Sequence, residues 1–350
     1  MRIEHNYSLK AHNTFGIRAN CHCFVEYSNV EEAVQAAAMI MEERAAQKNE
    51  CLVIGAGSNL LLTHDVKGIV VTSAIRGISL TEHPDGHAIL RCGSGEVWDD
   101  VVAWTVERGF SSLVNLSLIP GHVGASAVQN IGAYGAEVGA FVYMVHAIDI
   151  ASGRKVSIPG SECGYGYRDS RFKNEWRGRY LITHVDYAIS RSSLPLLDYG
   201  NIRAELERNG VEKPTPQQLR DIIIAIRRSK LPEPSELGNA GSFFKNPVVE
   251  RAQYEALAER WPSMPHYDAG QGKVKIPAGW LIEQCGWKGR AMGRAAVYER
   301  QALVLVNLGG ASGSDVVALC HAIQNDVRER YGISIEPEVN IVYSSFASFT

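Results

Sequence analysis

Five stretches of this sequence combine small, flexible turns with polar side chains that could do chemistry. The first is Gly55-Ala56-Gly57-Ser58-Asn59, which follows the short apolar run Cys51–Ile54. Small residues directly after a strand let backbone N–H groups come close to a pyrophosphate. However, the third glycine of the dinucleotide fingerprint is missing, and no clear crossover helix follows. Taken alone, this stretch fits a phosphate-binding turn and a tight structural turn equally well.

The second stretch lies within residues 115–139, which are rich in glycine, alanine and small polar residues and show little periodicity. It contains Ile119-Pro120-Gly121-His122-Val123-Gly124-Ala125-Ser126 and then Gln129-Asn130-Ile131-Gly132-Ala133-Tyr134-Gly135. An irregular segment of this length inside a compact domain usually has a function. We expect a loop that holds one side of a long anionic cofactor, with residues 55–59 on the other side. The alternative is an irregular surface loop, although such loops seldom carry so few charges.

The third and fourth stretches each present one reactive side chain. In Gly166-Tyr167-Arg168-Asp169-Ser170, the arginine offers a planar fork that suits a carboxylate or a phosphate. A structural pair with Asp169 explains the pattern equally well. In residues 238–247, Ser242 follows a glycine and precedes two phenylalanines. A hydrolase elbow requires a glycine two residues after the serine, and none is present, so this stretch fits a solvent-exposed turn as well as a site.

The fifth stretch, residues 335–339, places two glutamates in an alternating strand pattern. Glu336 and Glu338 share one face by the period of two, and a solvated face is the ordinary explanation. The cationic helix end from Arg227 to Lys230 has an equally ordinary explanation in the helix dipole. Neither pattern identifies a site by itself.

Composition limits the function classes more firmly. A length of 350 residues is too long for one ordinary core and predicts two or three packed units. The net charge of −3 excludes the generally basic surface that binds nucleic acid. The N-terminal residues contain no apolar signal region, and no apolar run reaches the length of a membrane span. We therefore expect a cytoplasmic protein with no nucleic-acid or membrane partner.

Cysteine usage also indicates a reducing compartment. Seven cysteines, an odd number scattered along the chain, are typical of reduced thiols and not of a disulfide framework. Cys21-His22-Cys23 lacks a second ligand pair at finger spacing, so we expect a structural role and no metal. His83 and His87 are separated by Pro84 and Gly86, which favour a turn over a helix.

The elements that position these stretches follow from periodicity and end signals. Asn29 and Glu32 form a capping box before an alanine-rich helix that runs to about Gln47. Thr215-Pro216 begins a second amphipathic helix, which must end before Pro232. Further helices are expected near residues 97–108, 249–260, 278–285 and 315–331, the last closed by Gly332. Strands are expected near residues 51–54, 68–72, 88–92, 145–150, 181–189, 302–307 and 333–342.

Together and in this order, the stretches resemble the MurB family of enolpyruvoyl reductases. The resemblance includes Asn13-Thr14-Phe15-Gly16 and covers nearly the whole chain. Its most specific motifs are Gly-Ser-Phe-Phe-Lys-Asn-Pro at residues 241–247 and the run from Pro120 to Gly135. Leu197-Asp198-Tyr199-Gly200 resembles the tyrosine loop of the longer subtype of the family.

The resemblance implies an α+β fold. Its FAD-binding domain is of the vanillyl-alcohol-oxidase (PCMH) type, in two α/β subdomains, and a C-terminal α/β domain binds the substrate. The expected domains are residues 1–200 and 201–345, with the last strand returning Glu338 to the active site. FAD is expected to be bound non-covalently, with His122 unlinked, and NADPH is the expected co-substrate. The implied reaction reduces UDP-N-acetylenolpyruvoylglucosamine to UDP-N-acetylmuramate in peptidoglycan precursor synthesis, and a monomer is expected.

The resemblance also assigns chemistry to three residues. NADPH reduces FAD first and leaves, and hydride then passes from flavin N5 to the methylene carbon of the enol ether. Arg168 and Glu338 match residues that contact the substrate carboxylate, where charge from the neighbouring carbon accumulates. Glu338 must be protonated or share a proton to stabilise that charge. Ser242 matches the proton donor, and this weak acid suffices because the acceptor is a strongly basic carbon.

The remaining site residues follow from matching positions in the family. The expected FAD-binding residues are Gly55, Ala56, Gly57, Ser58, Asn59, Pro120, Gly121, Gly124, Ala125, Ser126, Gln129, Asn130, Ile131, Gly132, Tyr134 and Gly135. The expected substrate-binding residues are Tyr167, Tyr199, Arg227, Lys230, Asn246, Tyr267, Lys275 and Gln301. Of these, we expect Arg227 to join Lys230 at the pyrophosphate of the sugar nucleotide.

Two other classes of protein stay open at this point. A flavoprotein oxidase of the same FAD superfamily would keep the N-terminal half but needs a different C-terminal cap, and residues 241–247 argue against it. A non-catalytic sensor of nucleotide sugars would keep the binding residues and lose Ser242 or Glu338, and both are present. The absorption spectrum of the purified protein is the simplest check, because a bound flavin gives a visible band.

Overall fold

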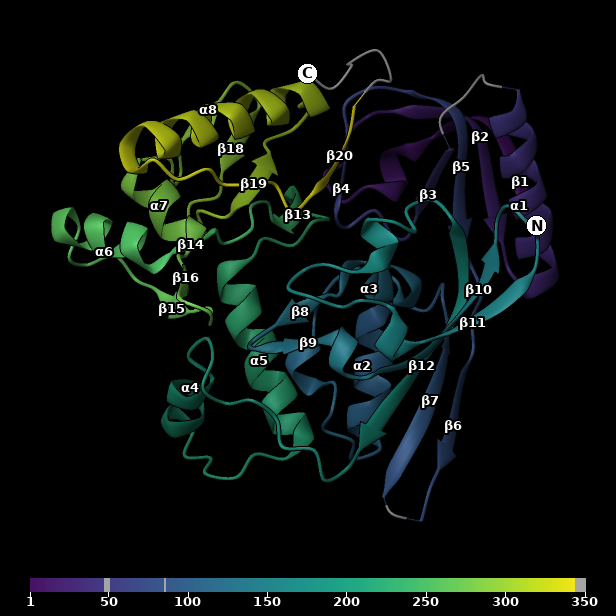
Figure 1. The fold of residues 1–350 in the computed structure, drawn as a ribbon, viewed down its shortest axis with the longest axis horizontal. Coiled ribbons are helices and arrows are strands. Elements are labelled where there is room, and N and C mark those ends of the chain that lie inside the picture. Colours follow the sequence, from purple (N-terminus) through teal and green to yellow (C-terminus); the bar gives the residue numbers. More distant parts are fainter. Residues whose placement is uncertain (47–50, 85, 344–350) are drawn as a thin grey trace. The chain divides into compact units, whose positions relative to one another are not determined.

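The computed structural model describes residues 1–46, 51–84 and 86–343, and the chain forms two compact units (Figure 1). Both units are built from segments that are separate in the sequence. The first unit comprises Met1–Ser8, Asn20–Gly57 and Val66–Arg228. The second unit comprises Leu9–Ala19, Ser58–Asp65 and Ser229–Thr350. Two short N-terminal segments therefore belong to the same unit as the C-terminal third of the chain.

A four-stranded sheet and the helix α1 (Val30–Ala45) form one part of the first unit. The strands lie in the order β1 (Arg2–Ser8), β2 (Asn20–Tyr27), β5 (Val66–Ser73) and β3 (Cys51–Ile54). β2 and β3 are parallel to β5, whereas β1 is antiparallel to β2. The alanines on one face of α1 are fully buried, because small residues at helical spacing let a helix lie close to a sheet.

The predicted start of α1 is confirmed. The Asn29 side-chain oxygen accepts a hydrogen bond from the Glu32 amide at 2.8 Å. The Glu32 carboxylate reaches one residue further back than a capping box requires and accepts from the Ser28 amide at 2.7 Å. The predicted end at Gln47 lies outside the described residues.

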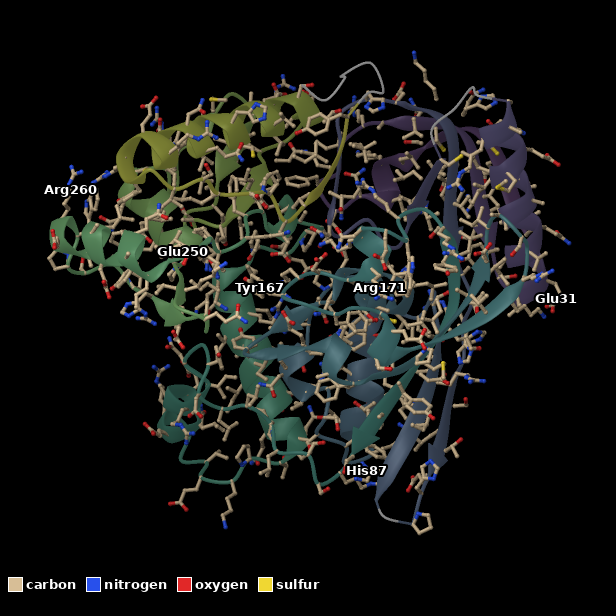
Figure 2. All side chains as sticks on the ribbon, in the orientation of Figure 1. Glu31, His87, Tyr167, Arg171, Glu250 and Arg260 are labelled. Carbon is tan, nitrogen blue, oxygen red and sulfur yellow. The ribbon has the colours of Figure 1, made fainter. Side chains whose placement is uncertain are left out.

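A five-stranded antiparallel sheet forms the other part of the first unit (Figure 1). Its order is β11 (Lys155–Pro159), β10 (Val142–Asp149), β12 (Tyr180–Ser190), β7 (His87–Gly93) and β6 (Ile78–Glu82). The helices α2 (Trp98–Glu107) and α3 (Val123–Gln129) bury apolar side chains in the same core. β6 and β7 are joined by the predicted turn, in which the His83 amide donates to the His87 carbonyl at 2.8 Å; His87 is labelled in Figure 2.

Residues 115–139 are not the continuous loop that the sequence predicts. They contain α3 and a hairpin of β8 (Gly132–Ala133) and β9 (Ala136–Glu137). The small residues hide the helical period, but Val123 and Ala127 give α3 a buried side. Tyr134 and Gly135 join β8 to β9 with φ values of 48° and 83°, the two positive values that a type I′ turn requires.

The helices α4 (Ile202–Arg208) and α5 (Pro216–Lys230) contribute to the core of the first unit. α5 begins as predicted, with the Thr215 hydroxyl accepting from the Gln218 amide at 3.2 Å. Buried side chains of both helices join the cluster around the five-stranded sheet, namely Ile202, Leu206, Leu219, Ile223 and Ile226. The units divide after Arg228, whereas the predicted domain boundary follows residue 200. In the sequence, the apolar face of α5 predicts that this helix packs on a core, but it does not predict which sheet belongs to that core.

A four-stranded sheet and two helices form the core of the second unit. The strands lie in the order β13 (Gly238–Ser242), β19 (Val304–Asn307), β18 (Ala295–Val297) and β17 (Ala291–Met292). The helices α7 (Ala278–Gln284) and α8 (Gly313–Tyr331) bury their apolar sides in this core (Figure 1). Gly332 ends α8 with a φ of 65°, as predicted.

Two smaller sheets complete the second unit. β14 (Val248–Glu250), β16 (Lys273–Lys275) and β15 (Tyr267–Asp268) form one, next to α6 (Arg251–Arg260). β20 (Asn340–Val342) pairs in parallel with β4 (Leu60–Leu62). The long final strand predicted for residues 333–342 is therefore confined to its last three residues. Before it, the described residues of this range form only an isolated antiparallel bridge, between Pro337 and Phe244.

The described part of the chain contains no helix long and apolar enough to cross a membrane. Within those residues, no group of three or more His, Cys, Asp and Glu side chains is arranged to hold a metal ion. The cysteines are free thiols, and burial raises the pKa of Cys21 to about 11. A neutral thiol is a poor metal ligand, which agrees with a structural role for residues 21–23.

We expect the ion pair between Arg220 of α5 and Asp99 of α2 to hold α5 in place. Both guanidinium nitrogens donate to the carboxylate, at 2.7 and 2.9 Å, and Arg220 is 8% exposed. Arg220→Ala should lower the free energy of unfolding by about 3 kcal/mol, because it leaves a buried charge without its partner.

Lys155→Ala is the control for this variant, since the Lys155–Glu31 pair of the same unit is exposed on both sides. It should cost much less stability than Arg220→Ala, because solvent screens an exposed pair. Urea unfolding followed by circular dichroism measures both losses. Equal losses would show that the buried pair has no special part in placing α5.

Candidate active site

The two small-residue stretches of the first unit meet at Gly55 and Ala125. A Cβ atom added to Gly55 would lie 2.9 Å from the Ala125 Cβ atom and 3.7 Å from that of His122. Gly57 adopts a φ of 69°, which residues with side chains rarely adopt. Gly55 therefore lies directly against the Ala125 methyl group, with no room for a larger side chain at either position. This is the arrangement that binding a pyrophosphate through backbone groups requires.

Backbone hydrogen bonds fix the second stretch to the loop after β7. The amides of Val123 and Gly124 donate to the carbonyls of Glu96 and Ser94, both at 2.9 Å. A Cβ atom at Gly124 would lie 3.0 Å from that of Ser94, so only glycine allows this approach without a shift. Sequence reasoning found Gly124 but gave no reason for it, and the reason is this contact.

Asp99 fixes the residue just before the same stretch, and this role was not predicted from the sequence. Its Oδ1 atom accepts from the Leu118 amide at 2.5 Å and from Arg220 at 2.7 Å. Leu118 adopts a φ of 57°, which is unusual for a residue with a branched side chain. The carboxylate thus links α5 to the start of the cofactor stretch. An acidic residue in the first turn of a helix is too common to have signalled this role.

Two predicted FAD-binding residues turn their side chains into the protein. Ser126 is 1% exposed, and its hydroxyl lies 2.7 Å from the Val123 carbonyl and 2.9 Å from the Tyr187 hydroxyl. Asn130 is equally buried, and its amide donates to the Gly166 carbonyl at 2.7 Å. Only the backbone atoms of these two residues are therefore available to contact a cofactor.

Arg168 is held in a tight turn beside the β8–β9 hairpin. Gly166 and Asp169 exchange backbone hydrogen bonds at 3.1 and 3.0 Å, and Arg168 between them adopts a φ of 55°. Its Nη2 atom donates to the Gly132 carbonyl at 2.5 Å. Tyr167, labelled in Figure 2, is 42% exposed at the tip of the turn. The Asp169 carboxylate accepts from Asn174 at 2.9 Å, which holds the far side of the turn.

Arg227 of α5 brings a second guanidinium group close to Arg168. Its Nε atom is buried and has no hydrogen-bond partner among the described residues. Burial lowers the pKa of Arg227, and the charge of Arg168 lowers it further, whereas Tyr134 and Asp99 act in the opposite direction. Two cations this close favour an anion between or beside them. We expected Arg227 to accompany Lys230, but its neighbours in the first unit are Arg168 and Tyr134.

In the second unit, one short backbone ladder places both Ser242 and Glu338. The Glu338 amide donates to the Phe243 carbonyl at 2.7 Å, and the Lys245 amide donates to the Glu336 carbonyl at 2.9 Å. Phe243 and Phe244 are fully buried, whereas Ser242 is exposed directly before them. The buried phenylalanines thus anchor the segment that presents the serine next to the glutamate.

Two asparagines, the buried Asn239 and the partly buried Asn59, support this ladder. The Asn239 side-chain oxygen accepts from the Gly241 amide at 2.9 Å and so sets the residue before Ser242. The backbone N–H of Asn239 donates to the Thr14 carbonyl at 3.0 Å, which gives the motif at residues 13–16 a structural role. Asn59 was predicted to bind FAD, but its side chain donates to the Glu338 carbonyl at 3.2 Å.

The substrate-binding candidates of the second unit fall into two pairs. Tyr267 and Lys275 are opposite each other on β15 and β16. Asn246 accepts from the Ala278 amide at 2.9 Å at the start of α7, and the Gln301 side-chain oxygen lies 3.3 Å from the Cβ position of Gly279. Lys230 ends α5 and is counted in the second unit, whereas Tyr199 lies in the first.

The fold and these loops define a flavoprotein. Residues 23–158 match the family described as FAD binding domain. The Gly55–Ala125 contact leaves only small side chains where the two stretches meet, and this suits the dinucleotide part of FAD. The expected PCMH-type FAD domain with a separate C-terminal domain is confirmed.

Residues 233–342 match the family described as UDP-N-acetylenolpyruvoylglucosamine reductase, C-terminal domain. The reductase of Bacteroides fragilis is 49% identical over 97% of this chain and 100% of its own length. That of Burkholderia ambifaria is 47% identical over 95% of each chain. The crystal structure of MurB from Thermus caldophilus shares the fold, with a TM-score of 0.63 and 23% identity over 97% of this chain and 99% of that one.

The chain belongs to the UDP-N-acetylenolpyruvoylglucosamine reductase (MurB) family. It is an FAD-dependent oxidoreductase of peptidoglycan precursor synthesis, with NADPH as the reductant. The predicted enzyme class, reaction and cofactor are therefore confirmed.

We expect Gly55→Ala to weaken FAD binding, because the new methyl group collides with Ala125. The bound flavin per chain, measured by absorbance after gel filtration, should fall. Ala125→Gly removes the colliding atom, so the double variant Gly55→Ala/Ala125→Gly should recover flavin. A single variant with full flavin content, or a double variant without recovery, would show that this contact does not shape the FAD site.

Proposed function

We propose that Ser242 is the proton donor of this reductase and that Arg168 and Glu338 act on the substrate carboxylate. The observation that carries the proposal is the 2.7 Å hydrogen bond from the Glu338 amide to the Phe243 carbonyl. It sets the glutamate beside the exposed serine on a ladder anchored by two buried aromatic rings. A serine without such a neighbour would be one of many surface hydroxyls.

The chemistry explains why these residue types suit the task. FAD, when bound, supplies the hydride that reaches the methylene carbon of the enol ether. The π bond of the C=C group breaks, and its electron pair moves to the neighbouring carbon and into the carboxylate. Glu338 must carry or share a proton to stabilise this charge, while the Arg168 guanidinium stabilises it as a cation. The Ser242 hydroxyl then gives its proton to the basic carbon, which forms the new C–H bond.

Arg227 strengthens the cationic side of the proposed site. Its buried Nε atom offers a hydrogen-bond donor that no described residue uses, close to the Arg168 charge. We place Arg227 with Arg168 at an anionic group of the substrate and leave Lys230 at the pyrophosphate. Asn246, Tyr267, Lys275 and Gln301 serve the remaining parts of the sugar nucleotide, together with Tyr167 and Tyr199.

We further assign the chain to the longer subtype of the family, with Tyr199 in its tyrosine loop. The loop after β12 supports this assignment, since it carries Tyr199, 50% exposed, before α4 begins. We also propose a cytoplasmic monomer, and the free cysteines agree with a reducing compartment. Sedimentation of the purified protein measures the oligomeric state directly.

The two competing classes explain less of the structure. A flavoprotein oxidase gives no role to the ladder that joins Ser242 and Glu338. A sensor needs the binding residues but no exposed hydroxyl held beside a glutamate. Both classes predict that the chain binds UDP-N-acetylenolpyruvoylglucosamine without reducing it, or does not bind it at all.

We expect the FAD to be bound non-covalently, with His122 unlinked. The loop at residues 55–59 contains no histidine or cysteine, and His122 is the nearest alternative attachment point. Acid precipitation should therefore release all the yellow chromophore into the supernatant. A pellet that stays yellow after washing would contradict this.

The role of Ser242 separates the two half-reactions. Reduction of FAD by NADPH delivers no proton to a carbon, so Ser242→Ala should leave that step close to wild type. Reoxidation by the enolpyruvyl substrate should slow by about 10²–10⁴-fold, as is typical of losing a positioned acid. Ser242→Cys should retain more activity than Ser242→Ala, because a thiol also delivers a proton. Stopped-flow absorbance at the flavin band follows each step.

Ser235→Ala is the control, since Ser235 is another exposed serine of the second unit. It should change neither half-reaction. If Ser242→Ala slows both steps equally, the serine organises the flavin site and does not protonate carbon. If it slows neither step, the assignment is wrong.

A further inference from the structure

In the first unit, Tyr134 and Tyr199 each cover the glycine that follows the other tyrosine in the sequence. A Cβ atom at Gly135 would lie 2.5 Å from Cδ2 of Tyr199, and one at Gly200 would lie 2.6 Å from Cε1 of Tyr134. Each ring therefore packs directly on the backbone beside the other ring. We call these four residues, Tyr134, Gly135, Tyr199 and Gly200, the tyrosine clasp. It joins the turn of the β8–β9 hairpin to the loop between β12 and α4.

The glycines of the clasp are required for two independent reasons. Their φ values are 83° at Gly135 and 64° at Gly200, in the left-handed region that disfavours side chains. In addition, the tyrosine rings occupy the space where a Cβ atom would be. Gly210 of the same unit has only the first reason. Gly210 has a φ of 67° and nothing within 4 Å of its Cβ position.

The loop that carries Tyr199 is partly exposed, although Leu197 within it packs against the core of the first unit. Leu194 is 91% exposed and Leu196 is 45% exposed. Asn115 holds the middle of the loop, donating to the Leu196 carbonyl at 2.7 Å and accepting from the Leu196 amide at 3.2 Å. The same Asn115 amide lies 3.4 Å from the Tyr134 carbonyl. Asn115 and the clasp therefore both attach the loop to the same β8–β9 hairpin.

Tyr134 also connects the clasp to the arginine pair. Its side chain is hydrogen-bonded to Arg227, whose charge opposes the rise in the Tyr134 pKa that burial causes. Arg227 in turn feels the charge of Arg168. One side chain thus packs against the Tyr199 loop with its ring and contacts the cationic group with its hydroxyl.

We infer that Tyr134 is a positioning residue for the sugar nucleotide: its ring, seated on Gly200, sets where Tyr199 stands relative to Arg227 and Arg168. The inference rests on the proposed role of Tyr199 in substrate binding. Through Tyr134, the tyrosine clasp connects a half-exposed aromatic side chain to two cations. A ligand with an anionic group and a sugar or base suits this combination.

Gly200→Ala tests the clasp, with Gly210→Ala as the matched control. Both variants force an alanine into the left-handed region, but only the first drives a methyl group into the Tyr134 ring. In the holoenzyme, hydrogen exchange of residues 194–200 should become about tenfold faster or more in Gly200→Ala and stay unchanged in Gly210→Ala. The KM for UDP-N-acetylenolpyruvoylglucosamine should rise by about tenfold in Gly200→Ala, with a smaller change in kcat.

Two tyrosine variants separate the ring from the hydroxyl. Tyr134→Phe keeps the ring on Gly200, so exchange in residues 194–200 should match wild type. Tyr134→Ala removes the ring and should give the fast exchange of Gly200→Ala. If Tyr134→Phe exchanges as fast as Tyr134→Ala, packing of the ring is not what holds the loop, and the inference is wrong.

Tyr199→Ala keeps this test apart from the proposed function. If Tyr199→Ala leaves the KM unchanged, Tyr199 does not bind the substrate and the proposed role fails. If Tyr199→Ala raises the KM while Gly200→Ala exchanges and binds like Gly210→Ala, the clasp alone is refuted. Fast exchange in Gly200→Ala with an unchanged KM refutes the positioning role, even though the contact exists.

Discussion

The first unit depends on how closely the backbones of its loops approach one another. Gly55 lies against Ala125 and Gly124 against Ser94, and a methyl group at Gly55 would meet an atom at 2.9 Å. Such contacts expose backbone groups to a phosphate that bulkier residues would screen. The same lack of large side chains removes the helical pattern from the sequence of these loops, because small residues do not separate into apolar and polar positions. The small side chains that suit these loops to a dinucleotide are therefore also the reason why α3 was predicted as irregular chain.

The second unit solves a different problem, which is to hold exposed functional side chains still. Ser242 and Glu338 gain little from their own packing, since the groups proposed to react must stay accessible. Their positions are instead set by neighbouring residues: the buried rings of Phe243 and Phe244, the buried side-chain amide of Asn239 and the partly buried side chain of Asn59. Buried amides are well suited to this, because each one satisfies several backbone groups and costs stability if it moves.

What could be predicted from the sequence follows from this difference. Helices with caps and apolar faces, such as α1, α5 and α8, were placed to within a few residues, and the family motifs identified the enzyme. The partition of the chain was not foreseen, because the apolar face of α5 does not reveal which core it joins. The roles of Asp99 and Asn239 were also missed. A single acid or amide gives no spacing pattern, and its partners are backbone atoms, such as the Leu118 amide and the Pro232 carbonyl, that every residue type provides.

The arginines of the first unit show how the fold prepares a site at a cost in its own stability. Arg220 is neutralised by Asp99, whereas Arg227, two turns further along α5, keeps a buried donor unused and lies near the charge of Arg168. A cation buried beside another cation is unfavourable unless an anion completes the group. Asp99 offsets part of this cost at a distance, and Tyr134 offsets part of it by direct contact. In the role proposed for Arg227 and Arg168, an anionic substrate relieves this residual imbalance on binding, and affinity and specificity for it then arise from the same uncompensated charge.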